Sequence, residues 1–325
     1  MKSWSRLGVL LATVAGLGVA VWTIGSAGLS DVIGTAARMG AGGFALYCAW
    51  TLGVFVLLGA AWLAAAPGEP LRSLFLFTWA RLVREAVSDL LPFSQLGGIF
   101  VSTRMLTQTS IPTTRVYGSM VVDMTTEMAS QLVYTLFGLA MMASLLIGDG
   151  AAVRLRPLIL GGTGVMIVVI LLFFTMQRAA LDLAGRMAAR FLPGSTALAD
   201  VRAELSRIYA RRAHVALAFV FNLAAWVASG MGAWLVLHLM GVRIAVWEVL
   251  SLESLIFTLR SVAFVVPGAI GVQEAGYALA APLFGLPPET ALALSLAKRA
   301  RELAMGLVTL LGWQLGEVRG LARSA

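Results

Sequence analysis

The stretch S-D-L-L-P-F-S-Q-L-G-G-I-F-V-S-T-R, residues 88–104, decides the fold, because it interrupts hydrophobic sequence with a proline and a pair of glycines. A counterpart follows 175 residues later, where V-V-P-G-A-I-G covers residues 265–271. The residues that match across this interval are Pro92 and Pro267, Pro112 and Pro287, and Glu127 and Glu302. Two prolines and a glutamate in one register predict an internal duplication built around a broken membrane helix.

The composition indicates a polytopic helical membrane protein. The 325 residues are 59% hydrophobic and 12% charged, and apolar runs long enough to cross a bilayer recur along the chain. The net charge of +8 comes from basic residues beside these runs, which favours an anionic bilayer surface over nucleic acid as the partner. The single cysteine, Cys48, excludes an intrachain disulfide, and we expect no metal and no cofactor.

The basic segment 177–212 sets the expected topology. The segments that we expect to span the membrane are 7–24, 42–66, 115–147, 158–176, 215–239 and 289–316. Segment 177–212 carries the densest group of arginines in the chain, and its pattern is typical of a helix on the membrane surface, although an ordinary solvated connector fits nearly as well. The positive-inside tendency places it in the cytoplasm.

Two charged segments complete this topology if each of them enters and leaves the membrane on the same side. They are Ser73–Pro112 and Trp247–Pro287, and both chain termini then lie in the cytoplasm. Broken backbone at membrane depth persists only where protein or a wet cavity surrounds it. The predicted fold is an all-α bundle in one membrane domain, 1–325, with two inverted repeats, about 42–147 and about 215–316, each containing a re-entrant, Pro/Gly-broken hairpin.

Prolines and glycines at the two breaks are the expected hinge or turn residues. A proline ends a helix because it lacks the N–H and clashes with the preceding turn, and a glycine permits a sharp turn. The expected hinge and turn residues are Pro92, Gly97, Gly98, Pro267, Gly268 and Gly271.

Ionisable side chains in and beside the hairpins are the candidate binding residues. Each charge at mid-membrane costs about 2.5 to 3.5 kcal/mol if it faces lipid, so these groups must pair or face a wet interior. Arg81, Glu85 and Asp89 are spaced by four and form one helical stripe. The candidate substrate-binding residues are Arg81, Arg84, Glu85, Asp89, Gln95, Arg104, Asp123, Glu127, Gln131, Glu253, Arg260, Gln273, Glu274, Lys298, Arg299, Arg301 and Glu302. No catalytic residue is assigned.

The motifs L-P-F-S-Q-L-G-G, V-D-M-T-T-E and V-V-P-G-A-I-G-V-Q-E-A-G resemble a known family. They are similar to the flippase-like membrane region of lysylphosphatidylglycerol synthases, and most similar to the hopanoid-biosynthesis-associated membrane proteins called HpnL. The resemblance covers about Leu71 to Glu317. It implies a multi-pass protein of the bacterial inner membrane that moves or handles a phospholipid or hopanoid between leaflets. Synthase activity is not expected, because the sequence reaches Ala325 without the soluble aminoacyl-transfer domain of those relatives.

Two other functions stay open at this point. Asp123 and Glu127, one helical turn apart, could serve acid–base chemistry in an intramembrane lipid-modifying enzyme. The basic segment 177–212 could instead make the chain a membrane scaffold for lipid-synthesis enzymes. Buried ion pairs can also hold helices in register without touching any substrate. Self-association into a homo-oligomer is compatible with the sequence.

Overall fold

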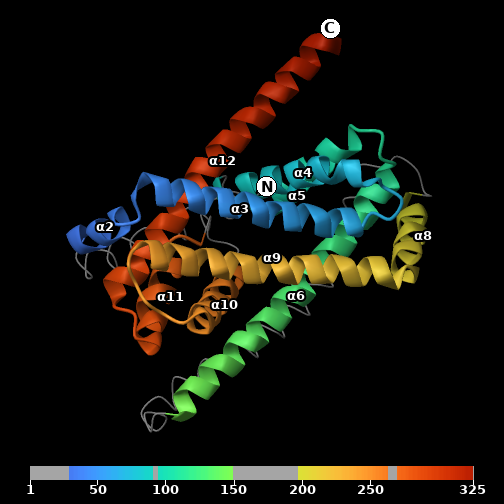
Figure 1. Cartoon of the computed structure of the whole chain (residues 1–325). Coiled ribbons are helices and arrows are strands. Elements are labelled where there is room, and N and C mark those ends of the chain that lie inside the picture. Colours follow the sequence, from blue (N-terminus) through green and yellow to red (C-terminus); the bar gives the residue numbers. More distant parts are fainter. Residues whose placement is uncertain (1–28, 91–93, 149–196, 263–268, 325) are drawn as a thin grey trace, which may run out of the picture. The chain divides into compact units, whose positions relative to one another are not determined.

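The computed structural model describes residues 29–90, 94–148, 197–262 and 269–324, and every regular element in these ranges is a helix (Figure 1). The helices are α2 (Leu29–Ala37), α3 (Gly40–Ala64), η1 (Leu71–Ser73), α4 (Leu74–Leu90), α5 (Ser94–Thr107), α6 (Thr113–Gly148), α8 (Ala197–Ala210), α9 (Arg212–Leu239), α10 (Val246–Val262), α11 (Val272–Ala280), η3 (Ala281–Phe284) and α12 (Pro288–Ser324).

The chain divides into two compact units. The first unit comprises Met1–Gly53, Arg81–Ser102 and Ser229–Ala325, and the second comprises Val54–Ala80 and Thr103–Ala228. Four helices, α3, α4, α5 and α9, contribute residues to both units.

Two of the described helices are long and apolar enough to cross a membrane. These are α3, with 25 residues, and α9, with 28 residues. Both match predicted spans. A glycine with positive φ marks the start of α3 and the end of α9. Gly40 precedes the body of α3 with φ +66°, and Gly241 follows α9 with φ +84°, a left-handed backbone that glycine adopts without strain.

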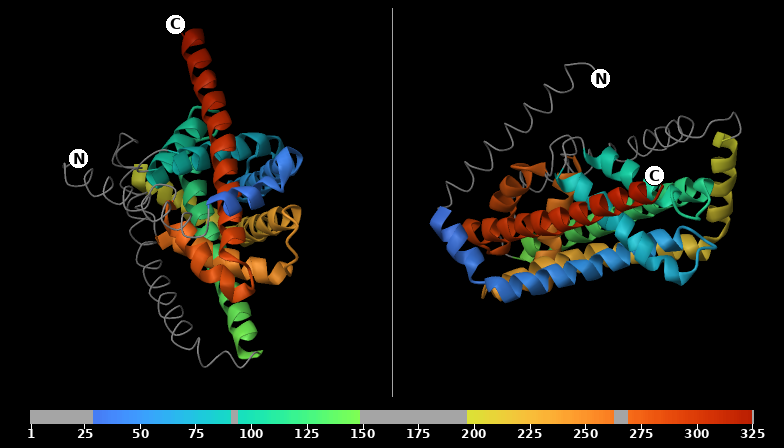
Figure 2. Two further views of the ribbon diagram at one scale, coloured as in Figure 1. Left: turned by 90° about the vertical axis from the view of Figure 1, so that its left-hand side faces the viewer. Right: turned by 90° about the horizontal axis from the view of Figure 1, so that it is seen from above.

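The first unit is built on α10, α11 and the first half of α12 (Figure 2). Helix α11 packs against both α10 and α12, and α2 packs along α12. A Cβ atom built on Gly276 of α11 would lie 2.9 Å from Cδ1 of Leu259 and 3.0 Å from Cδ1 of Ile256, both on α10. Glycine at this position therefore lets α11 approach α10 closely.

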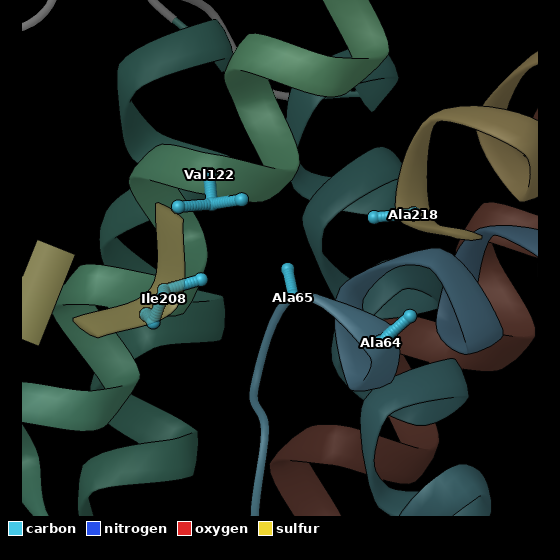
Figure 3. Packing of buried hydrophobic residues seen from close by; sticks show 5 residues of the cluster. All are labelled: Ala64, Ala65, Val122, Ile208 and Ala218. Atoms are coloured by element: carbon cyan, nitrogen blue, oxygen red, sulfur yellow. The ribbon is translucent and has the colours of Figure 1, made fainter. Parts of the chain in front are cut away.

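The second unit is built on α6 and α8. A buried apolar cluster joins Ala64 and Ala65 with Val122, Ile208 and Ala218 (Figure 3). Helix α8 packs its apolar side against α6, with Ile208 fully buried. Residues 177–196 of the predicted surface segment lie outside the described residues. The described part of that segment includes α8, which packs on α6.

The order of the helices is compatible with the predicted duplication, which stays a prediction. α3, α4, α5 and α6 are followed by α9, α10, α11 and α12, and the starts of matched helices shift by nearly the same interval. Helix α6 begins one residue after Pro112 and α12 begins one residue after Pro287. The predicted spans 7–24 and 158–176, and the hinge residues Pro92, Pro267 and Gly268, lie outside the described residues.

The structure corrects the predicted role of two glycines. Gly97 and Gly98 lie inside α5, within its first turns, and not in a turn between helices. A Cβ atom on Gly98 would collide with the backbone carbonyl of Arg84 and with Oγ of Ser88, both on α4. Gly98 therefore permits close helix packing. Gly271 does lie in a turn, with φ +81° immediately before α11.

Candidate functional site

The charged residues of α12 meet the α10–α11 hairpin in the first unit. Ser295, Lys298, Arg299 and Glu302 recur at intervals of three and four, which places them on one face of the helix. Helix α11 presents Gln273, Glu274 and Tyr277 to this face, and α10 presents Glu253 and Arg260. Asp89, at the end of α4, joins them from the first repeat.

One carboxylate holds three guanidinium groups. Oε1 of Glu302 accepts a hydrogen bond from Nη1 of Arg260 at 2.8 Å and one from Nη2 of Arg301 at 3.4 Å. Its Oε2 accepts from Nη1 of Arg299 at 3.1 Å. Nη2 of Arg260 also lies 3.5 Å from Oδ1 of Asp89, which brings together charges from the two repeats.

Helix α11 anchors this network through Gln273 and Glu274. Nη1 of Arg260 donates to Oε1 of Gln273 at 2.8 Å, and Nε2 of Gln273 donates to Oγ of Ser295 at 2.8 Å. Oε1 of Glu274 accepts from Ser295 and from Nε of Arg299. Its Oε2 accepts from the backbone N–H of Gly271 at 2.7 Å, which caps the start of α11.

We call this set the arginine cluster. Its members are Asp89, Arg260, Gln273, Glu274, Ser295, Arg299, Arg301 and Glu302. The three arginines face three carboxylates, so the cluster carries no net charge when all six groups are ionised. The side chains of Arg260, Arg299 and Arg301 are 18–19% exposed and that of Asp89 is 23% exposed. The cluster is therefore partly reachable from outside the protein.

A second set, the lysine triad, lies on the same helices. Nζ of Lys298 donates to Oε2 of Glu253 at 2.6 Å and to the hydroxyl of Tyr277 at 2.9 Å, and Tyr277 in turn donates to Oε1 of Glu253. The ring of Phe257 lies under Nζ of Lys298, with 4.8 Å to its centroid. The Lys298 side chain is 4% exposed and that of Glu253 is 0% exposed, so the triad is sealed.

A smaller polar site lies in the second unit. Nδ2 of Asn222, on α9, donates to Oγ1 of Thr126 at 3.1 Å and lies 3.5 Å from Oδ1 of Asp123. All three residues are buried. Asp123 on α6 and Lys298 on α12 are 175 residues apart, the interval of the predicted duplication, and they carry opposite charge.

The remaining candidates on α4 fall inside the first unit. Arg81 and Arg84 are buried, and Glu85 is partly buried, on the same helix as Asp89. Asp89, the last member of the predicted stripe, lies 3.5 Å from a cation on α10, Nη2 of Arg260.

Three other candidates belong to the second unit. Glu127 and Gln131 are partly buried on α6 in the second unit, and Arg104 is exposed on α5. The backbone of Gln95 belongs to α5, and its side chain lies outside the described residues.

Five polar side chains of these sites were not among the sequence-based candidates. They are Tyr47, Thr126, Asn222, Tyr277 and Ser295. Asn222 had a usable signal, because an amide inside an otherwise apolar span is costly without a partner. Tyr277 follows Glu274 by three residues and Ser295 precedes Lys298 by three, so each lies one helical turn from a charged neighbour. Tyr47, whose ring lies under the guanidinium of Arg301 with 5.6 Å to its centroid, sits in an ordinary apolar run.

Long apolar helices and a neutral, buried set of ion pairs define an α-helical membrane protein. The chain belongs to the family described as the lysylphosphatidylglycerol synthase TM region, whose model matches residues 7–312. No curated protein and no solved structure matches it. The family assignment confirms the predicted resemblance and makes the chain a membrane protein of a lipid-related family, while the narrower hopanoid resemblance stays a prediction.

Proposed function

We propose that the protein is a lipid flippase or transporter that moves a polar-headgroup lipid between the leaflets of the bacterial inner membrane. The arginine cluster is the proposed headgroup site. One observation carries this proposal: a charge-balanced cluster within a hydrophobic protein stays partly exposed. Ionisable groups within membrane segments are expensive, and they mark pathways for polar substrates more often than they serve as helix connectors.

The helix lengths support re-entrant hairpins. Helix α4 has 17 residues and α10 has 17, so each is about 26 Å long at the usual helical rise. Helix α11 has 9 residues and reaches about 14 Å. A bilayer core is about 30 Å thick, so these helices fit hairpins that turn back within it better than complete crossings.

Reciprocal contacts support a two-fold relation between the repeats. Gly43 and Ala218 occupy matching positions of α3 and α9, as do Ala64 and Leu239. In the first unit, a Cβ atom on Gly43 would lie 3.3 Å from Cδ1 of Leu239. In the second unit, Ala64 and Ala218 belong to one buried cluster. Each copy thus offers the same two positions to the other, as an isologous pairing requires.

A second pair of contacts repeats this pattern. Arg301 of α12 lies over Tyr47 of α3, and Thr126 of α6 bonds to Asn222 of α9. Tyr47 matches Asn222 across the interval of 175 residues, and Thr126 matches Arg301. Inverted repeats of this kind allow transporters to open to alternate sides of one central site. We propose that the repeats are inverted, with both termini in the cytoplasm.

Reconstitution of the full chain tests the proposal. Purified protein is placed in vesicles that contain trace fluorescent lipids, and the fraction of label reachable by a membrane-impermeant quencher is followed with time. We expect the protein to accelerate exchange between leaflets, and Arg260→Gln to abolish the acceleration. Thin-layer analysis of the same vesicles separates transport from chemistry. A changed lipid species without leaflet exchange would favour a lipid-modifying enzyme, and hopanoid movement can be scored in the same assay.

A further inference from the structure

The ion pairs of the arginine cluster differ in the distance between their nitrogen and oxygen atoms. Arg260 binds Glu302 at 2.8 Å, which is ideal for a charge-assisted hydrogen bond. The pairs Arg301–Glu302, at 3.4 Å, and Arg260–Asp89, at 3.5 Å, are the two longest in the cluster. Nε of Arg301 is buried and donates to no acceptor. Arg301 and Asp89 are therefore the cation and the carboxylate that an incoming group can engage most readily.

Charge balance restricts what can bind there. The cluster is neutral with three arginines and three carboxylates ionised. An anionic headgroup would leave one uncompensated negative charge in a low-dielectric site, and a cationic headgroup would leave one positive charge. A headgroup that carries one positive and one negative charge adds no net charge to the cluster. Arg301 and Asp89 are linked through Arg260, which binds the same Glu302 oxygen as Arg301 and lies 3.5 Å from Oδ1 of Asp89, so one guanidinium separates the two groups.

We propose that the transported lipid has a zwitterionic headgroup, a phosphate joined to an ammonium, and that it binds by exchange of ion pairs. The phosphate takes the guanidinium of Arg301 from Glu302, and the ammonium takes the carboxylate of Asp89 from Arg260. Arg260 keeps Glu302 and Gln273, so no charge is left without a partner. Tyr47 supports the Arg301 guanidinium from its other face. This inference rests on the proposed function, because it names the lipid class of the same site.

Two lipids that differ in headgroup charge test the inference in vesicles of the full chain. Phosphatidylethanolamine is zwitterionic and phosphatidylglycerol is anionic, and both carry the same fluorescent acyl chain. We expect exchange of phosphatidylethanolamine to be faster by at least about tenfold, the ratio associated with one charge-assisted contact. Equal rates, or faster phosphatidylglycerol, would overturn the inference and leave the flippase proposal standing. A third outcome would overturn both the inference and the flippase proposal. In it, neither of these lipids nor a hopanoid polyol exchanges faster than in protein-free vesicles.

A charge-changing variant tests the exchange itself. Asp89→Asn leaves the cluster with one excess positive charge, so we expect the preference to shift toward phosphatidylglycerol. The matched control is Glu289→Gln, which removes a carboxylate in the first turn of α12, outside the cluster. An unchanged ratio of the two rates in a folded Asp89→Asn protein would contradict the exchange. Size-exclusion profile and thermal unfolding establish folding, and the wild-type ratio decides the question alone if the variant does not fold.

Discussion

The lysine triad and the arginine cluster are two sets of buried charges on the same helices, and they differ in exposure. Glu253 and Lys298 are 0% and 4% exposed, whereas the arginines of the cluster are 18–19% exposed. The triad closes on itself, since Tyr277 and Lys298 both donate to Glu253. The cluster has long pairs and an unsatisfied donor. Sealed charge of this kind serves to hold helices together, and open charge is available to a ligand.

The largest expected effect comes from breaking the triad. Lys298→Met leaves the Glu253 carboxylate buried without a cation, which should lower the free energy of unfolding by about 3–5 kcal/mol. Adding Glu253→Gln removes the lone charge and should restore much of that loss. Denaturant titration in detergent, followed by circular dichroism, measures both variants. A stable Lys298→Met protein with defective transport would instead assign the triad to the transport pathway.

The next largest effect is expected where α5 packs on α4, the helix that carries Asp89. Gly98→Ala places a Cβ atom against the Arg84 carbonyl of α4, so it should destabilise the protein by about 1–3 kcal/mol through overpacking. Gly97→Ala is the matched control, because its Cβ atom would meet only Cγ1 of Val87 at an ordinary 3.5 Å. The same titration compares them. Equal stability of the two variants would show that α4 and α5 do not pack as described.

Neutralising one open arginine should separate transport from stability. Arg301→Gln removes the proposed phosphate donor, and we expect lipid exchange to fall by about tenfold, as for one charge-assisted contact. The free energy of unfolding should change by less than about 1 kcal/mol, since a partly exposed ion pair contributes little. Arg207→Gln, at a side chain 78% exposed on α8, is the control and should retain wild-type exchange. A large loss of stability in Arg301→Gln would show that the arginine cluster, like the lysine triad, serves to stabilise the fold.

The smallest expected effect on lipid exchange concerns the turn before α11. Gly271→Ala forces a Cβ atom into a left-handed backbone with φ +81°, which costs about 1–2 kcal/mol. Gly285→Ala, at φ +69° after η3 and outside both charged sets, is a control that also places a side chain at positive φ. We expect both variants to lose stability and only Gly271→Ala to slow lipid exchange. Equal exchange rates in the two would separate the turn from the cluster.

Features of the fold that depend on local chemistry were predictable from the sequence. Charges in apolar runs and prolines within them are conspicuous, so the helical membrane class, the repeat register at Pro112 and Pro287, and the charged members of the cluster could be read in advance. The start of α12 at Pro288 follows from the fixed φ of proline and its missing N–H at the first helical position.

Features that depend on contacts between distant segments were not predictable. Gly98 was assigned to a turn because its own sequence cannot reveal that α4 approaches it. Asp89 pairs with Arg260, 171 residues away, a contact that helical spacing on its own helix cannot reveal. Tyr47 and Asn222 gain their polar roles only where α12 and α6 pass them.

Glu274 gives the turn before α11 a further consequence. One of its oxygens fixes the backbone at Gly271, and the other belongs to the ionic network through Arg299 and Ser295. Any rearrangement of that network would therefore also act on the backbone at Gly271, at the start of α11. If the proposed headgroup site is correct, the mobility of a spectroscopic label at Ile270 should change when a headgroup binds, before the lipid crosses the membrane.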